Sequence, residues 1–96
     1  MKYEVIKRAS FKRGVRRAAK RGLDLSLLES VILLLASGVP LPADFKDHPL
    51  KGARSGLREC HIDGKKGDWL LVYRKIDDAL LLYLVDTGTH DELFGK

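Results

Sequence analysis

Cysteine is almost missing from this chain: Cys60 is the single one among 96 residues. One thiol excludes an internal disulfide and a zinc site built from four cysteines. Cys60 falls in an alternating apolar pattern typical of a strand, which favours a structural thiol over a reactive one. We therefore expect a protein of a reducing compartment, the cytoplasm.

Long apolar runs are missing as well. Runs such as Val31 to Ala36 are far short of the roughly 18 residues that a membrane helix needs. Lys7 and Arg8 interrupt the only apolar stretch near the N-terminus, so no secretory signal is predicted. We expect no association with a membrane.

The length of the chain leaves no room for separate cofactor and substrate domains. Ninety-six residues suit one compact domain, here 1–96, and the hydrophobic fraction of 45% is ordinary for a folded protein. We therefore expect one ordered domain that does its chemistry without a cofactor.

Acidic residues are scarce at the start of the chain. Residues 1–22 hold nine Lys or Arg and one acid, Glu4, a net charge of +8, whereas the rest carries −3. Charge segregated in this way indicates a polyanionic partner, although many charge runs are only solvated faces. The basic residues that we expect to contact the partner are Lys12, Arg13, Arg16, Arg17 and Lys20.

Apolar periodicity predicts two helices near the N-terminus, after a short strand around Val5. Ser10 is a suitable N-cap for a helix that runs to Arg21, and Asp24 for a second helix that ends at Gly38. The short connection between them predicts a helical hairpin.

The second half of the chain predicts strands. Alternating or apolar segments at 57–62, 69–75 and 80–85 follow an irregular stretch, 38–56. The order β-α-α-β-β-β predicts an α+β fold in which the helical hairpin packs on one face of an antiparallel-rich sheet.

Three histidines, His48, His61 and His90, lie at predicted strand ends or in loops. Imidazole can give or take a proton near neutral pH. Glu59 shares a strand face with His61, and Asp68 begins the next strand. A zinc site is the alternative, but no histidine pair has helical or zinc-finger spacing, so we predict no metal.

Four segments together resemble the YafQ-type toxins of the RelE/ParE superfamily. They are Lys46–Asp47–His48–Pro49–Leu50–Lys51–Gly52, Arg58–Glu59–Cys60–His61, Asp68–Trp69–Leu70–Leu71–Val72–Tyr73 and Thr87–Gly88–Thr89–His90 followed by Leu93–Phe94–Gly95. The resemblance implies a RelE-like fold and a ribosome-associated endoribonuclease, an mRNA interferase. It also implies a monomeric toxin that a cognate antitoxin neutralises in a hetero-oligomer.

The resemblance further implies roles for individual residues. In such toxins the 2′-hydroxyl of the mRNA attacks the adjacent phosphate while histidines and an acid move the protons. His48, His61, His90 and Asp68 match the proton-transfer positions, and Glu59 a position that would orient them. Two aromatic residues match positions where a base could stack, with burial in the core as the alternative; they are Trp69 and Phe94. The basic helix would contact ribosomal RNA or an acidic antitoxin segment.

One position departs from the resemblance. Such toxins carry an arginine just before the Thr–Gly–Thr–His run, where this chain has Asp86. Loss of a donor that stabilises charge at the reacting phosphate costs about a hundredfold in rate. We expect another cation to replace it; the candidates are Lys65, Lys66, Arg58 and Arg74.

Two other functions remain open at the level of sequence. A ParE-like toxin would bind DNA gyrase without catalysis and would not need the three histidines. A basic RNA-binding domain would not be toxic at all.

Overall fold

The structure is a computed structural model that describes residues 2–64 and 67–95. Its elements are β1 (Glu4–Lys7), α1 (Ala9–Lys20), α2 (Leu25–Ala36), η1 (Ala43–Phe45), β2 (His48–Pro49), η2 (Gly52–Arg54), β3 (Arg58–His61), β4 (Leu70–Ile76), β5 (Leu81–Gly88) and α3 (His90–Phe94). Two of the candidate cations, Lys65 and Lys66, lie outside the described residues.

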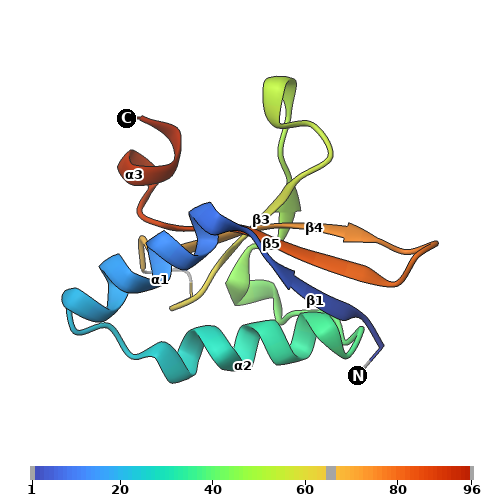
Figure 1. The fold of residues 1–96 in the computed structure, drawn as a ribbon, viewed down its shortest axis with the longest axis horizontal. Coiled ribbons are helices and arrows are strands. Elements are labelled where there is room, and N and C mark those ends of the chain that lie inside the picture. Colours follow the sequence, from blue (N-terminus) through green and yellow to red (C-terminus); the bar gives the residue numbers. More distant parts are fainter. Residues whose placement is uncertain (1, 65–66, 96) are drawn as a thin grey trace.

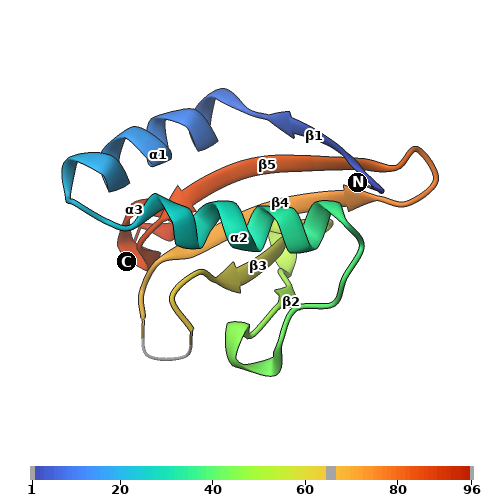
Figure 2. The ribbon, with the colours of Figure 1, turned by 90° about the horizontal axis from the view of Figure 1, so that it is seen from below.

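The strands form one five-stranded sheet in the order β1-β5-β4-β3-β2. The neighbours from β5 to β2 pair antiparallel, and β1 pairs parallel to β5. Helix α2 runs along one side of the sheet with α1 beside it, whereas α3 and the segment containing η2 rise on the other side (Figures 1 and 2). The predicted α+β class is confirmed. The side that carries α3 and η2 is called the open face below.

The caps of the two long helices differ in how well the sequence predicted them. Asp24 caps α2 as expected, accepting the Ser26 amide at 3.0 Å. The N-cap of α1 is Arg8, so the prediction of Ser10 was wrong. The Ser10 hydroxyl instead donates to the Val85 carbonyl of β5, because packing α1 against the sheet offers it a tertiary acceptor.

Helix α1 approaches β5 at a glycine. The buried residues of α1 are Phe11, Gly14 and Ala18, and a Cβ on Gly14 would stand only 2.2 Å from the Thr87 carbonyl oxygen. The missing side chain is what permits the close contact between helix and strand.

Helices and sheet enclose the core on the face opposite the open one. Leu71 and Tyr73 of β4 and Leu82 and Leu84 of β5 are fully buried there. Cys60 has no exposed surface, and burial raises the pKa of its thiol to about 12. It is a structural, unreactive thiol, as expected.

A β-bulge in β5 changes which side chains reach the open face. Val72 pairs with Asp86 and Tyr73 with Leu84, so Val85 is the extra residue. Cross-strand partners share a face, and Val72 also pairs with Glu59. The bulge therefore turns Asp86 to the open face, across Val72 from Glu59, whereas strict alternation would have placed it with Leu84 in the core.

The segment predicted to be irregular contains a short strand that the sequence did not reveal. Residues His48 and Pro49 form β2, with His48 opposite Glu59 and Pro49 opposite Arg58. Proline is tolerated because β2 is an edge strand. This pairing brings His48 to the sheet.

Among the described residues, the helices are too short or too polar to cross a bilayer.

Candidate active site

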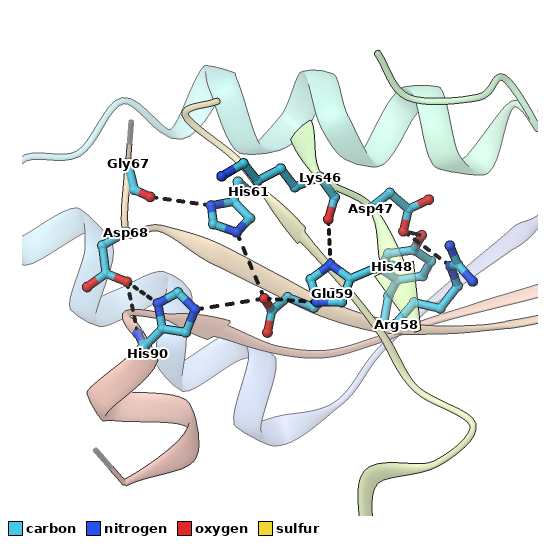
Figure 3. A network of polar contacts seen from close by, with 10 residues as sticks. Lys46, Asp47, His48, Arg58, Glu59, His61, Gly67, Asp68 and His90 are labelled. Atoms are coloured by element: carbon cyan, nitrogen blue, oxygen red, sulfur yellow. Dashed lines mark hydrogen bonds and ion pairs between the residues drawn. The ribbon is translucent and has the colours of Figure 1, made fainter. Parts of the chain in front are cut away.

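The three histidines converge on one oxygen atom (Figure 3). Glu59 Oε2 lies 3.6 Å from His48 Nε2, 3.9 Å from His61 Nε2 and 3.9 Å from His90 Nε2. The four side chains come from β2, β3 and the first residue of α3, so segments distant in sequence build one cluster on the open face. The structure thus brings together the residues that the sequence singled out one by one.

The opposite nitrogen of each imidazole faces an acceptor. His48 Nδ1 lies 2.6 Å from the Lys46 carbonyl oxygen, and His61 Nδ1 lies 3.3 Å from that of Gly67. His90 Nδ1 lies 2.6 Å from Asp68 Oδ1. These acceptors hold a proton on every Nδ1. In the neutral rings, Nε2 would then turn a lone pair toward the Glu59 carboxylate. The cluster is therefore built to take up a proton or another cation between its Nε2 atoms.

Exposure divides the cluster into an inner and an outer pair. The side chains of Glu59 and His61 are only 6% and 11% exposed, whereas those of His48 and His90 are 48% and 51% exposed. The two outer rings stand on either side of Glu59 (Figure 3). A ligand on the open face can therefore touch His48 and His90 directly, with Glu59 and His61 beneath.

Asp68 holds His90 in place. Its Oδ1 accepts from His90 Nδ1 at 2.6 Å and from the His90 amide at 3.2 Å. These bonds lower the pKa of the Asp68 carboxyl below its usual 3.8, so Asp68 is an ionised acceptor at neutral pH. The reciprocal capping box between Thr89 and Glu92 fixes the start of α3.

A partly buried set of three side chains, Asp47, Arg58 and Tyr73, holds the loop that carries His48. Asp47 Oδ1 accepts from the Tyr73 hydroxyl at 2.5 Å and from Arg58 Nε at 3.2 Å. Tyr73 is 1% exposed, which ties the loop to the core. Arg58 is thus committed to Asp47, and this pairing does not support the substrate-binding role expected of it. No sequence pattern indicated this set, because its three residues meet only in the folded chain.

The two predicted stacking residues lie in different surroundings. Trp69 is 4% exposed, belongs to the core and donates its indole N–H to Thr87 Oγ1 at 3.0 Å. This burial favours the core alternative and does not support stacking. Phe94 is half-buried, and its ring centroid lies 6.2 Å from that of His90. A base could reach Phe94 from the cluster.

Arg54, which sequence analysis passed over, touches Phe94. Its guanidinium carbon lies 4.6 Å from the ring centroid, and Nη2 donates to the Leu93 carbonyl at 3.4 Å. No motif flags Arg54, because η2 and α3 are brought together only by folding.

Other predicted residues surround the cluster at a greater distance. Arg74 is exposed and lines a hollow of about 360 Å³ together with Arg8, Ser10 and Tyr83.

Asp86 is partly shielded from solvent, and this burial raises the pKa of its carboxyl above the usual 3.8. The Thr87 amide donates to the carboxylate at 2.9 Å and acts in the opposite direction. The open face thus carries an acid where the resemblance implies an arginine.

The basic face of α1 is only partly free. Lys12, Arg13, Arg16 and Lys20 are exposed. Arg17 instead has Nε 3.4 Å from Glu92 Oε2 and donates from Nη2 to the Thr87 carbonyl at 3.3 Å. Arg17 thus links α1 to α3 and β5, which separates it from the solvated cations.

The inner part of the cluster also has the geometry of a metal site. One ligand atom from each of Glu59, His61 and His90 lies within 4.8 Å of the other two. Two imidazoles and a carboxylate are a common ligand set for Zn²⁺. The site residues therefore fit a divalent cation as well as a proton.

Comparisons with known proteins place this architecture among bacterial toxins. Residues 3–95 match the profile of a family described as a bacterial toxin of type II toxin-antitoxin system, YafQ. The chain is 42% identical over 86 residues to the mRNA interferase toxin YafQ of Escherichia coli K12, covering 88% of each chain.

Two solved structures have the same fold. YafQ in the E. coli DinJ-YafQ toxin-antitoxin complex is 36% identical, with a TM-score of 0.85 over 99% of this chain and 100% of that one. A metal-bound toxin from Helicobacter pylori is 40% identical, with a TM-score of 0.86 over 96% and 99%.

The sheet with its helical hairpin and the matching structures define a small α+β toxin of a toxin-antitoxin system. Within that class, the chain belongs to the YafQ family.

Proposed function

We propose that this protein is the toxin of a type II toxin-antitoxin system and cleaves mRNA in the cytoplasm as an endoribonuclease. The observation that carries the proposal is the approach of three imidazoles to the Glu59 carboxylate. RNA supplies its own nucleophile, the 2′-hydroxyl, so cleavage needs a base, an acid and positive charge near the phosphate. The relative from E. coli is named an mRNA interferase.

His48 and His90 suit the base and the acid because they are the exposed members of the cluster. The Asp68 carboxylate accepts from the His90 ring at Nδ1, whereas the acceptor at His48 Nδ1 is a neutral carbonyl. We assign His48 as the base that takes the proton of the 2′-hydroxyl. His90 is the acid that protonates the departing 5′-oxygen, which leaves a 2′,3′-cyclic phosphate.

Glu59 and His61 act from beneath the two outer rings. The Glu59 carboxylate faces all three Nε2 atoms, so it can stabilise whichever ring carries the proton during the reaction. His61, almost fully buried, shares that charge and fixes the carboxylate. Both are positioning residues, as is Asp68.

The products of cleavage test the function directly. Expression of the wild-type chain should arrest growth and produce mRNA fragments that end in a 2′,3′-cyclic phosphate, as mapped by ligation that requires this end group. The matched control is His90→Gln, which keeps a polar side chain. Normal growth and an unchanged pattern of mRNA ends with the wild type would remove the proposal and favour an RNA-binding domain. Arrest without cleavage would favour a gyrase-binding toxin.

The ribosome and an antitoxin are the partners that fit the surface. The solvated cations of α1 suit ribosomal RNA, to which mRNA is presented. The solved DinJ-YafQ complex supports a cognate antitoxin that neutralises a monomeric toxin in a hetero-oligomer. Acidic segments of that antitoxin would compete with ribosomal RNA for the cations of α1.

Charge reversal on α1 tests the RNA surface. Arg13→Glu and Arg16→Glu together should weaken ribosome binding and lower the slope of log affinity against log salt by about 1 for each phosphate that is no longer neutralised. Arg17 is left intact because it holds α3. The control, Arg13→Lys with Arg16→Lys, should bind like the wild type. Equal affinities and salt slopes for both pairs would show that this face is only solvated.

Metal ions should compete with catalysis. Zn²⁺ held by Glu59, His61 and His90 would occupy the nitrogen of His90 that must deliver a proton. We expect Zn²⁺ to inhibit cleavage and EDTA to restore it. Titration calorimetry should give a Zn²⁺ affinity at least about tenfold weaker for Glu59→Gln. Cleavage that requires Zn²⁺ and stops with EDTA would contradict the metal-independent mechanism.

A further inference from the structure

The open face has an excess of negative charge for a site that binds an anion. Three acids lie on this side of the sheet: Glu59 in β3 faces the histidines, Asp68 before β4 bonds to His90, and Asp86 of β5 lies across Val72 from Glu59. Charge on the phosphate grows as the 2′-oxygen attacks, and carboxylates oppose it. If RNA is cleaved here, a cation must lie close to the reacting phosphate.

Most neighbouring cations are already engaged. Arg58 pairs with Asp47 at 3.2 Å, and its Cα partner is the core-facing Tyr73, so it projects to the other side of the sheet from Glu59. Arg17 lies against Glu92 and the Thr87 carbonyl. Arg74 lines the separate hollow with Arg8 and Tyr83. None of these three arginines contacts the histidine cluster among the described residues.

Arg54 differs from these residues in both position and partners. The η2 segment and α3 both stand up from the open face of the sheet (Figure 1). Arg54 reaches from η2 to α3, with its guanidinium 4.6 Å from the Phe94 ring centroid, and Phe94 in turn lies 6.2 Å from His90. Two successive ring contacts therefore connect the guanidinium to the proposed acid.

The guanidinium also has capacity to bind a ligand. Within residues 2–64 and 67–95, no carboxylate lies within 4.0 Å of Arg54, and only its Nη2 has a hydrogen-bond partner, the Leu93 carbonyl at 3.4 Å. The other N–H groups remain for two phosphate oxygens, which a planar guanidinium can bind side by side. Stacking on Phe94 fixes the plane of the group without using those donors.

We infer that Arg54 is the phosphate-binding residue of this toxin and supplies the positive charge that Asp86 does not. The inference deepens the proposed cleavage reaction and rests on it. It assigns the η2 segment to the active site. The Arg54–Phe94 pair then binds one nucleotide: the guanidinium binds the phosphate, and the half-buried phenyl ring borders the base.

Single-turnover cleavage at saturating RNA tests Arg54. Arg54→Ala should slow the chemical step by about 100-fold. Arg54→Lys keeps the charge, so its rate of cleavage should fall by a clearly smaller factor. Arg8→Ala is the matched control: it removes an exposed arginine that lines the separate hollow, and this rate should stay unchanged. Circular dichroism melting should give the same midpoint for all variants.

Moving the charge distinguishes phosphate binding from a merely structural role in holding α3. Asp86→Arg added to Arg54→Ala should recover most of the lost rate, because position 86 lies on the same face. A structural role predicts that Asp86→Arg restores nothing. Unrecovered activity, or a wild-type rate for Arg54→Ala, overturns the inference. If the wild type itself gives no cleavage that depends on His90, the proposed function has failed instead.

Discussion

Replacement of His90 by alanine is expected to reduce the single-turnover rate of RNA cleavage by about 10²- to 10⁴-fold, the usual contribution of a general acid or base. The reason is geometric. Of the two exposed rings that face Glu59, only His90 has a carboxylate on its other nitrogen. Loss of the ring removes the group that donates a proton to the leaving oxygen.

A substrate with sulfur in place of the bridging 5′-oxygen separates the acid from the base. A thiolate leaves without protonation, so His90→Ala should cleave this substrate at close to the wild-type rate. His48→Ala should remain slow on both substrates, because the 2′-hydroxyl still needs a base. The opposite pattern would exchange the two assignments, and equal losses for both variants on both substrates would contradict them.

Asp68 sets the range of pH over which His90 stays oriented. The pKa of its carboxyl is lowered, first of all by the hydrogen bond from His90. A lowered carboxyl pKa means that the interaction is complete above the usual value of 3.8 and is lost as the pH falls through the lower, folded-state value. Titration of Asp68 should therefore not change the slope of the pH-rate profile between about pH 5 and 9. Any change of slope in that range comes from another group.

The second large effect concerns stability rather than chemistry. Alanine is a better helix former than glycine by about 1 kcal/mol. Gly14→Ala should nevertheless destabilise this protein. Its Cβ would stand 2.2 Å from the Thr87 carbonyl oxygen and 2.9 Å from Thr87 Cγ2, so α1 must move away from β5. We expect a net loss of about 2 kcal/mol in the free energy of unfolding and a melting temperature lower by about 10 °C.

A second substitution tests whether the clash is the cause. Thr87→Ser removes Cγ2 but leaves the backbone carbonyl, which is the nearer atom. It should therefore fail to rescue Gly14→Ala in thermal melts. Ala19→Gly, a change at an exposed position of the same helix, gives the scale of a pure helix-propensity effect. A Gly14→Ala protein as stable as the wild type would show that α1 and β5 are not as close as described.

Sequence patterns predicted the elements where local interactions dominate. Asp24 caps α2 through its own backbone neighbours, and alternation along β3 places Glu59 with His61 on one face. The prediction failed where a tertiary partner prevailed over a local one. Ser10 bonds to Val85 of β5 instead of capping α1. For Trp69 the sequence left stacking and burial open, and the side chain is buried in the core.

By itself, the sequence determined the composition of the site: three imidazoles and their acids, the absence of a disulfide, the segregated positive charge and the α+β class. These follow from residue chemistry and from periodicity over a few neighbours. Only the tertiary structure decided which atoms meet. The two-residue strand at His48, the bulge that turns Asp86 outward and the contact between Arg54 and Phe94 all depend on pairing between distant segments. Such pairings minimise the free energy of the whole chain, so no local pattern encodes them.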